Sequence, residues 1–303
     1  MDISHNNKEL IVIAGPTASG KTALSVELAQ KLGTAILSAD SRQCFKEMNI
    51  GVAKPTEEEM QGVPHYFIDA HSITEDVNAG MYEQYGLSVL EGIFSKKDKA
   101  IVVGGTGLYI KALCEGLDNM PTIDKSVREN IVAQYESNGL SWLQQQVTEH
   151  DPTYWNTTTE KENPQRLMRA LEVVETTGKS ILHFRSHSGK KRDFSIKKYA
   201  IEWPRQLLYE RINQRVDLMI TNGLVEEVRH LLPYRQLNAL QTVGYTEIFD
   251  FLDNKTDLPT AIQKIKTNTR HYAKRQMTWF KRDTDIEWIQ PTQFSDFIHS
   301  FTA

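Results

Sequence analysis

Cysteine and long apolar runs are what this chain of 303 residues most clearly lacks. Its two cysteines, Cys44 and Cys114, have no metal-ligand spacing and would be an odd choice for a secreted disulfide scaffold, which indicates packing residues in a reducing compartment. The apolar run behind the polar start at Met1 to Lys8 is too short, and too soon ended by glycine, for a signal peptide or a membrane span. We therefore expect a cytoplasmic protein with no membrane partner.

The chain also lacks a strong excess of charge and any internal repeat or low-complexity segment. A formal net charge of -4 argues against a protein that coats nucleic acid over its whole surface, although it leaves room for a local basic patch. The length allows one large domain or two, with enough apolar residues for a core. These limits indicate an ordinary globular protein.

What is present is a phosphate-binding loop in the context that gives its pattern meaning. The sequence fits G-x-x-x-x-G-K-S/T after the apolar run Leu10 to Ala14, which predicts a buried strand, and before Ala23 to Lys31, which predicts a helix. The loop residues are Gly15, Pro16, Thr17, Ala18, Ser19, Gly20, Lys21 and Thr22. Its glycines let successive N–H groups point at phosphate oxygens, aided by the positive end of the helix and by the charge of Lys21. Because the Thr22 hydroxyl can ligate Mg²⁺, we predict a di- or triphosphate that carries the metal, rather than a structural corner with incidental glycines.

Short apolar strands alternate with helical stretches in the first part of the chain, which predicts a parallel sheet flanked by helices, an α/β fold of the P-loop NTPase type. A long stretch with helical periodicity then precedes one more strand. We predict a core formed by residues 1–120 and 193–303, with an inserted all-helical subdomain at 121–192. The predicted strands are Leu10 to Ala14, Ala35 to Ser38, His65 to Ile68, Ala100 to Val103 and Lys198 to Trp203.

Two further polar positions follow strands of this sheet. Asp40 comes after the second strand, and ligands of open α/β sheets bind at that edge, so we expect it near the phosphate loop. There it could accept a proton from a nucleophile or help to hold Mg²⁺, or with Ser41 it could simply cap a helix. The strand Ala100 to Val103 runs into Gly-Gly-Thr-Gly, where an ATPase often has an acidic residue and this chain has none. Thr106 there suits a second contact to phosphate, unless the segment is only a glycine-rich turn.

Five segments in this order and spacing resemble the tRNA dimethylallyltransferases over nearly the whole chain. They are Gly15 to Thr22, Asp40 to Gln43, Ile50 to Pro55, Gly104 to Ile110 and Arg166 to Val173. The resemblance implies transfer of a dimethylallyl group from dimethylallyl diphosphate to the N6 amine of the adenosine 3′-adjacent to the anticodon, with the P-loop holding the donor's diphosphate. The chain lacks the Cys/His pairs of the zinc finger that eukaryotic relatives often carry, so it resembles the compact bacterial type, for which a monomer is expected.

The resemblance also implies roles for single residues. Asp40 would be the general base that takes a proton from the adenine amine. Lys21, the P-loop amides and Mg²⁺ near Thr22 would stabilise the departing diphosphate. Thr106 and Arg128 match family positions that contact the donor and the target nucleotide. An adenine in a stacked anticodon loop must be flipped out before it can react.

The segment Thr260 to Arg282 holds seven cations and no acidic residue, which predicts a basic helix that binds phosphates of nucleic acid rather than a merely solvated face. Three cations recur every fourth residue, and we expect them to point outward: Lys266, Arg270 and Lys274. Three apolar residues would anchor the opposite face: Ile265, Tyr272 and Trp279.

The resemblance implies tRNA contacts in four clusters of residues. One of these clusters lies in the segment Gln241 to Glu247, which lacks the arginines often found there in relatives. The candidates are Asp40, Ser41, Arg42, Gln43, Gln165, Arg166, Leu167, Met168, Arg169, Gln241, Thr242, Val243, Gly244, Tyr245, Lys274 and Arg275. Three alternatives remain open: a P-loop phosphotransferase acting on a small metabolite or nucleotide, a prenyltransferase for free adenine nucleotides, and a noncatalytic RNA-binding protein with a relict P-loop.

Overall fold

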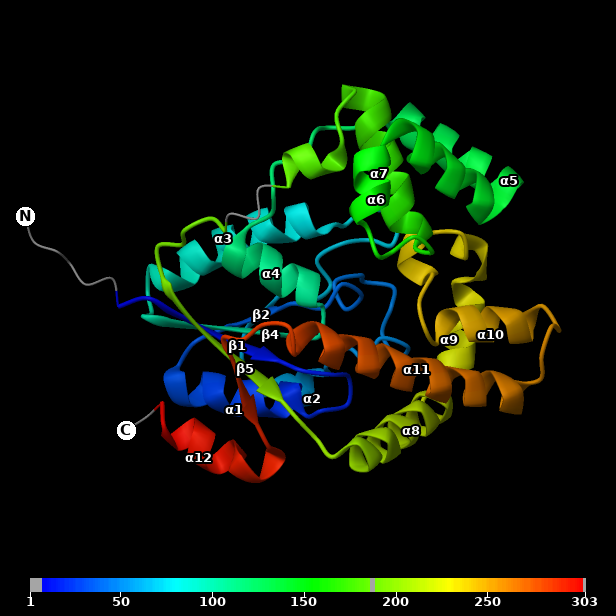
Figure 1. The fold of residues 1–303 in the computed structure, drawn as a ribbon. Coiled ribbons are helices and arrows are strands. Elements are labelled where there is room, and N and C mark those ends of the chain that lie inside the picture. Colours follow the sequence, from blue (N-terminus) through cyan, green and yellow to red (C-terminus); the bar gives the residue numbers. More distant parts are fainter. Residues whose placement is uncertain (1–6, 186–188, 302–303) are drawn as a thin grey trace, which may run out of the picture. The chain divides into compact units, whose positions relative to one another are not determined.

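The computed structural model describes residues 7–185 and 189–301, so residues 186–188 of the predicted insertion lie outside the described part. The described residues of Met1–Gly116 and Lys191–Ala303 form one compact unit, and those of Leu117–Lys190 form a second. Figure 1 shows the helices and strands of both units.

The first unit is built on a six-stranded parallel sheet with the strand order β3-β2-β4-β1-β5-β6. The strands are β1 Glu9–Ala14, β2 Ile36–Ser38, β3 His65–Tyr66, β4 Lys99–Gly104, β5 Ser195–Ile201 and β6 Ile286–Ile289. The predicted P-loop α/β fold is confirmed, with the loop directly after the central strand β1. Strand β6 was not predicted, because four residues at a sheet edge carry too weak an alternation to stand out.

Helices cover both faces of this sheet. Successive side chains of β1 point to opposite faces, and because nearly all of them are apolar and buried, each face needs a covering layer. Ile11 and Ile13 pack into a core with Leu24 of α1 and Ile298 of α12, whereas α3 and α4 lie on the other side (Figure 1). The α-helices of the unit are α1 Lys21–Leu32, α2 Glu57–Met60, α3 Ala79–Phe94, α4 Gly107–Glu115, α8 Arg205–Thr221, α9 Leu224–His230, α10 Tyr245–Leu252, α11 Leu258–Phe280 and α12 Phe294–His299. Three 3₁₀ turns join them, η2 Leu232–Tyr234, η3 Asn238–Leu240 and η4 Pro291–Gln293. Within the described residues, no helix has the length and apolar character needed to cross a membrane.

The regular elements among the described residues of the second unit are all helices. They are α5 Lys125–His150, α6 Pro152–Thr157, α7 Pro164–Thr177 and η1 Ile181–Phe184. Helix α5 is kinked at Gly139, whose φ of 76° favours glycine. Buried Asp151 connects the start of α6 with the start of η1. One of its carboxylate oxygens accepts from Tyr154 N at 3.0 Å, and the other accepts from Ile181 N at 3.1 Å. Asn163 caps α7, because its side-chain oxygen accepts from the Arg166 amide.

Candidate active site

The phosphate loop runs from the end of β1 to Gly20, which precedes α1 with a φ of 92°. Lys21 folds back over the loop, and its Nζ donates to the Pro16 carbonyl oxygen at 2.6 Å. Burial and, to a smaller extent, the nearby charge of Arg215 lower the pKa of Lys21, and Asp40 partly offsets both, so that the resulting pKa is about 7. An anion bound in the loop would therefore favour the charged form of this lysine.

Side chains from the C-terminal half of the unit hold the backbone of the loop. Arg211 Nε donates to the Ala18 carbonyl oxygen at 2.8 Å, and Trp203 Nε1 donates to the Ser19 carbonyl oxygen at 2.9 Å. Ala18 has a φ of 61°, a conformation that is costly for a residue with a Cβ and must be maintained by such contacts. The loop is thus fixed by groups that no local pattern in the sequence connects with it.

Asp40 follows β2 and is held by its own loop. Its Oδ1 accepts from the backbone N–H of Arg42 at 2.9 Å and of Gln43 at 3.2 Å. These residues form a turn and not a helix, so the helix-cap alternative is wrong. The described residues supply no hydrogen bond to Oδ2. A carboxylate with one oxygen fixed and the other open can accept a proton or hold a metal-bound water.

Thr106 joins the end of β4 to the loop that carries Asp40. Its N–H donates to the Ala39 carbonyl oxygen at 3.1 Å, and its Oγ1 accepts from the Ser41 N–H at the same distance. Gly104 permits this approach, because a Cβ there would collide with the Ala39 backbone. The hydroxyl of Thr106 therefore already has a structural role beside the one predicted for it.

A cavity of about 160 Å³ brings these groups together within the first unit. It contains predicted residues of the P-loop, of the Asp40 loop and of the 242–244 turn, together with side chains from α8 and α11 that were not predicted. Its polar lining includes Thr17, Lys21, Thr22, Ser38, Asp40, Arg42, Gln43, Arg215, Thr242, Thr269, Tyr272 and Gln276. Burial raises the pKa of Tyr272 to about 12, so its hydroxyl stays protonated at neutral pH.

Arg215 and Gln276 are the functional candidates that the sequence analysis missed. Arg215 lies on α8 and its guanidinium donates to Thr17 Oγ1 at 3.4 Å. Burial lowers the pKa of Arg215, yet an arginine stays charged at neutral pH. In the sequence both residues look like ordinary positions of amphipathic helices, so only the fold connects them with the P-loop.

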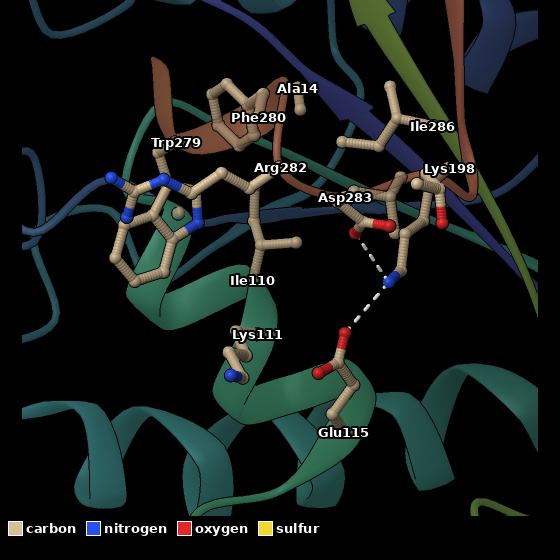
Figure 2. Close-up of a pocket in the computed structure, with 13 residues that line it drawn as sticks. Ala14, Ile110, Lys111, Glu115, Lys198, Trp279, Phe280, Arg282, Asp283 and Ile286 are labelled. Atoms are coloured by element: carbon tan, nitrogen blue, oxygen red, sulfur yellow. Dashed lines mark hydrogen bonds and ion pairs between the residues drawn. The ribbon is translucent and has the colours of Figure 1, made fainter. Parts of the chain in front are cut away.

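A larger cavity of about 360 Å³ lies on the side of the sheet covered by α4 and the end of α11. Figure 2 shows Lys198 reaching between Glu115 and Asp283, with Nζ–O distances of 2.9 and 2.8 Å. These two carboxylates compensate the charge of Lys198 and raise its pKa despite burial. Because this cavity contains neither the P-loop nor Asp40, we assign the chemistry to the smaller one.

The turn before α10 divides into accessible and buried parts. Thr242, Val243 and Gly244 line the smaller cavity. The side chain of Tyr245, in contrast, is fully buried, and its hydroxyl donates to Glu227 at 2.6 Å. The expectation that the Tyr245 side chain contacts tRNA is therefore corrected, because its phenol packs against Gly51 inside the unit.

Helix α11 presents fewer free cations than its sequence predicts. Lys274 and Arg275 are exposed, as expected. Lys266 instead forms an ion pair with Asp217 at 2.6 Å, and Arg270 donates to Asn213 at 2.9 Å. The expected outward direction of these two cations is wrong, because α8 lies against α11 and offers them polar partners.

The remaining candidates lie in the second unit. Arg128 forms an ion pair with buried Glu172 and donates to Gln165 Oε1 at 2.9 Å. Arg169 reaches the other oxygen of Glu172 at 3.1 Å. Arg166 is exposed and pairs with Glu160. Two other predicted tRNA contacts, Leu167 and Met168, have side chains in the core of the unit. These side chains are not available to nucleic acid, so the expectation that they contact tRNA is corrected.

The oxygen atoms of the cavity fit a magnesium ion better than a softer metal. Thr22 and Asp40 line it together, which supplies a hydroxyl and a carboxylate. Mg²⁺ prefers such oxygen ligands and usually keeps phosphate oxygens and water as the others. The described residues contain no group of three or more His, Cys, Asp or Glu side chains that could hold a metal by themselves.

Comparisons with known proteins cover nearly the whole chain. A family model described as IPP transferase matches residues 43–283. A tRNA dimethylallyltransferase of Cytophaga hutchinsonii is 47% identical over 294 residues, which cover 97% of this chain and 96% of the relative. The full-length tRNA isopentenylpyrophosphate transferase from Bacillus halodurans superposes with a TM-score of 0.72 at 32% identity, covering 97% of this chain and 96% of that one. A eukaryotic dimethylallyltransferase described as acting on tRNA gives a TM-score of 0.75 at 27% identity, over 93% of this chain and 74% of that one.

Proposed function

Because this chain belongs to the IPP transferase family, we propose that it transfers a dimethylallyl group from dimethylallyl diphosphate to tRNA, at the N6 amine of the adenosine 3′-adjacent to the anticodon. The observation that carries the proposal is that one cavity contains both a P-loop lysine and an open carboxylate, Lys21 and Asp40. A prenyl transfer needs a site for the leaving diphosphate beside a base for the attacking amine.

The reaction exchanges one bond for another at C1 of the donor. The C1–O bond to the diphosphate breaks, the bond between C1 and adenine N6 forms, and N6 loses a proton. Asp40 Oδ2 is the acceptor for that proton, since Oδ1 is occupied by the two amides of its loop. A base in position is typically worth about 10²- to 10⁴-fold in rate.

The leaving diphosphate gains negative charge as the C1–O bond breaks. Lys21, Arg215 and the remaining free amides of the P-loop stabilise it. Thr22 would hold Mg²⁺, which would neutralise part of the diphosphate charge when bound. Thr106 keeps the Asp40 loop at the same edge of the sheet through its bond to Ser41.

Cations of each unit bind phosphate groups of tRNA. Lys274 and Arg275 on α11 and Arg166 of the second unit are exposed, and Arg169 of the second unit is half-buried beside Glu172. Arg128 contacts the target nucleotide or the donor. The protein acts as a cytoplasmic monomer.

Nucleoside mass spectrometry tests the proposal. Unmodified tRNA is incubated with the protein, Mg²⁺ and dimethylallyl diphosphate, beside a reaction that contains ATP and no prenyl donor. We expect a five-carbon mass gain on adenosine that depends on the donor. ATP consumption against a small acceptor, with no change in tRNA, would support the phosphotransferase alternative instead.

A further inference from the structure

Gln276 is a buried polar side chain on α11, 6% exposed, and it bonds to two different loops. Its Oε1 accepts from the Thr17 N–H at 2.9 Å, and its Nε2 donates to the Gly105 carbonyl oxygen at 2.9 Å. The orientation of the amide is determined by its neighbours, because the opposite one would face N–H with N–H and oxygen with oxygen. Both ends of the side chain are therefore used.

The two loops carry opposite ends of the proposed reaction. Thr17 belongs to the loop that holds the diphosphate, and Gly105 directly precedes Thr106. Thr106 in turn accepts from the Ser41 amide, next to Asp40. Hydrogen bonds of Gln276, the peptide bond between Gly105 and Thr106, and the Thr106–Ser41 hydrogen bond thus connect the leaving-group loop with the loop that carries the base.

Gln276 packs closely against the backbone at Gly105. A Cβ at Gly105 would collide with the Gln276 amide, so a larger residue there would displace Gln276 from its hydrogen bond to the Gly105 carbonyl oxygen. On the P-loop side, the bond to Gln276 occupies the Thr17 N–H. That amide fixes the loop and is not available to a phosphate oxygen.

We propose that Gln276 is a positioning residue that sets the distance between the diphosphate and Asp40. The proposal rests on the proposed function, since it requires that leaving group and base act on one substrate pair. Loss of Gln276 would let the two loops move apart while leaving each of them intact. Misplacement of reacting groups by about 1 Å can cost on the order of 10²-fold in rate.

A merely structural role makes a different prediction. Loss of two buried hydrogen bonds would then lower stability or ligand affinity without a specific effect on the chemical step. The two roles separate in the single-turnover rate at saturating tRNA and donor, compared with the affinity for inorganic diphosphate in Mg²⁺ and with the melting temperature.

The first variant is Gln276→Met, which keeps the length of the side chain and removes both hydrogen bonds. We expect its saturated single-turnover rate to fall 10- to 100-fold, while the diphosphate Kd stays within threefold of the wild type. The second is Gln276→Glu, which can still accept from Thr17 but can no longer donate to Gly105 when ionised. Its saturated rate should also fall at least 10-fold. The matched control is Gln263→Glu, the same change at an exposed position of the same helix, which should leave the rate unchanged.

Three outcomes decide the matter. Saturated rates within threefold of the wild type in both variants overturn the positioning role. A rate loss in Gln276→Met that is matched by an equal loss of diphosphate affinity also overturns the positioning role. If Gln276→Met does not fold, the saturated rate of Gln276→Glu alone decides between the two roles. If the wild type and Gln263→Glu transfer no prenyl group to tRNA, the proposed function fails and this inference falls with it, which distinguishes the two failures.

Discussion

At the scale of single residues, Asp40 permits a substitution that changes its chemistry and leaves its loop in place. Asp40→Asn keeps an Oδ1 that can accept from the amides of Arg42 and Gln43, but it removes the carboxylate. We expect the prenyl-transfer rate to fall about 10²- to 10⁴-fold, with tRNA affinity within a few-fold, measured by single-turnover kinetics and filter binding.

Asp40→Ala is the companion variant, because it removes both the base and the acceptor for the loop amides. It should be at least as slow as Asp40→Asn and also less stable. A rate for Asp40→Asn close to that of the wild type would show that another group takes the proton.

Lys21 makes donor binding depend on pH. Because its pKa in the free protein is lowered to about 7, the ammonium form is lost as the pH rises through that value. A bound diphosphate favours the ammonium form, so binding above pH 7 takes up a proton and weakens as the pH rises. We expect the Kd for dimethylallyl diphosphate to increase several-fold per pH unit between about pH 7.5 and 9, and the increase should approach tenfold per unit at the upper end of this range. Calorimetry at a fixed Mg²⁺ concentration measures this Kd.

Lys21→Arg provides the control, because arginine stays charged throughout this range. Its Kd should be flat where that of the wild type rises. Parallel curves for the two proteins would assign the pH dependence to another group.

Local motifs are what made single residues predictable. The P-loop, Asp40 and Thr106 each follow a strand within a few positions, and strand ends of a parallel sheet meet at one edge. Arg215 and Gln276 have no such local signal. They reach the loop only because α8 and α11 fold back against it.

At the scale of elements, Glu227 of α9 ties two loops of the site to each other. Its carboxylate accepts from the N–H groups of Ile50 at 2.7 Å and Gly51 at 3.0 Å, and from the Tyr245 hydroxyl. In Glu227→Gln one acceptor becomes an NH₂ group that faces donors. We expect the free energy of unfolding to fall by about 1–3 kcal/mol, measured by urea denaturation.

Glu226→Gln is the matched control at the preceding position. Glu226 is exposed, and its one ion-pair partner among the described residues is Arg229 on the same helix face. Exposed pairs of this kind contribute about 0–1 kcal/mol, so this variant should unfold near the wild-type midpoint. Equal losses in the two variants would argue against a specific role for Glu227.

Helix α11 supplies the second prediction at this scale. Charge reversal at its exposed pair, Lys274→Glu with Arg275→Glu, should weaken tRNA binding and make its dependence on salt concentration less steep, since fewer counterions are released. Binding isotherms over a range of KCl concentrations measure both effects. Dimethylallyl diphosphate affinity should stay within a few-fold, and a loss of it instead would indicate a disturbed P-loop.

The basic helix also shows where periodicity stops being informative. The spacing of Lys266, Arg270 and Lys274 correctly puts them on neighbouring turns. It does not reveal that Asp217 and Asn213 of α8 lie opposite the first two. Which cations remain for a partner is decided by tertiary packing.

At the scale of the whole molecule, the chain leaves the first unit after α4 and re-enters it before β5. Arg192, just before β5, connects the segment that re-enters the unit with the end of α4, where the chain leaves it. Its guanidinium donates to the carbonyl oxygens of Ala112 and Leu113, both at 2.8 Å, and to Glu83. We predict that replacing residues 117–190 by a short Gly/Ser linker leaves the first unit folded. Circular dichroism should show a cooperative melt, with diphosphate affinity within a few-fold of that of the full chain.

The same variant should lose at least tenfold in tRNA affinity, because exposed Arg166 and half-buried Arg169 are removed with the second unit. A chain that no longer melts cooperatively would show that the first unit depends on the second for its fold. Unchanged tRNA affinity would place the binding surface entirely on the first unit.

Alternation of strands and helices was enough to predict the parallel sheet, because only a sheet covered on both faces buries such continuous apolar strands. The order of strands was less accessible. The alternation does not reveal that β5, from beyond the helical unit, is the strand that pairs with β1.

That pairing has a consequence for the order in which the protein can be made. During synthesis β1 can pair with β4 early, but its other edge stays open until the ribosome has added everything up to β5. An open apolar edge is a site of aggregation. Trp203, Arg211 and Gln276, which hold the phosphate loop, emerge later still. A nascent or truncated chain therefore carries the complete P-loop sequence without the means to shape it, and the first half of the protein should be insoluble or inactive if it is released before the last helices are added.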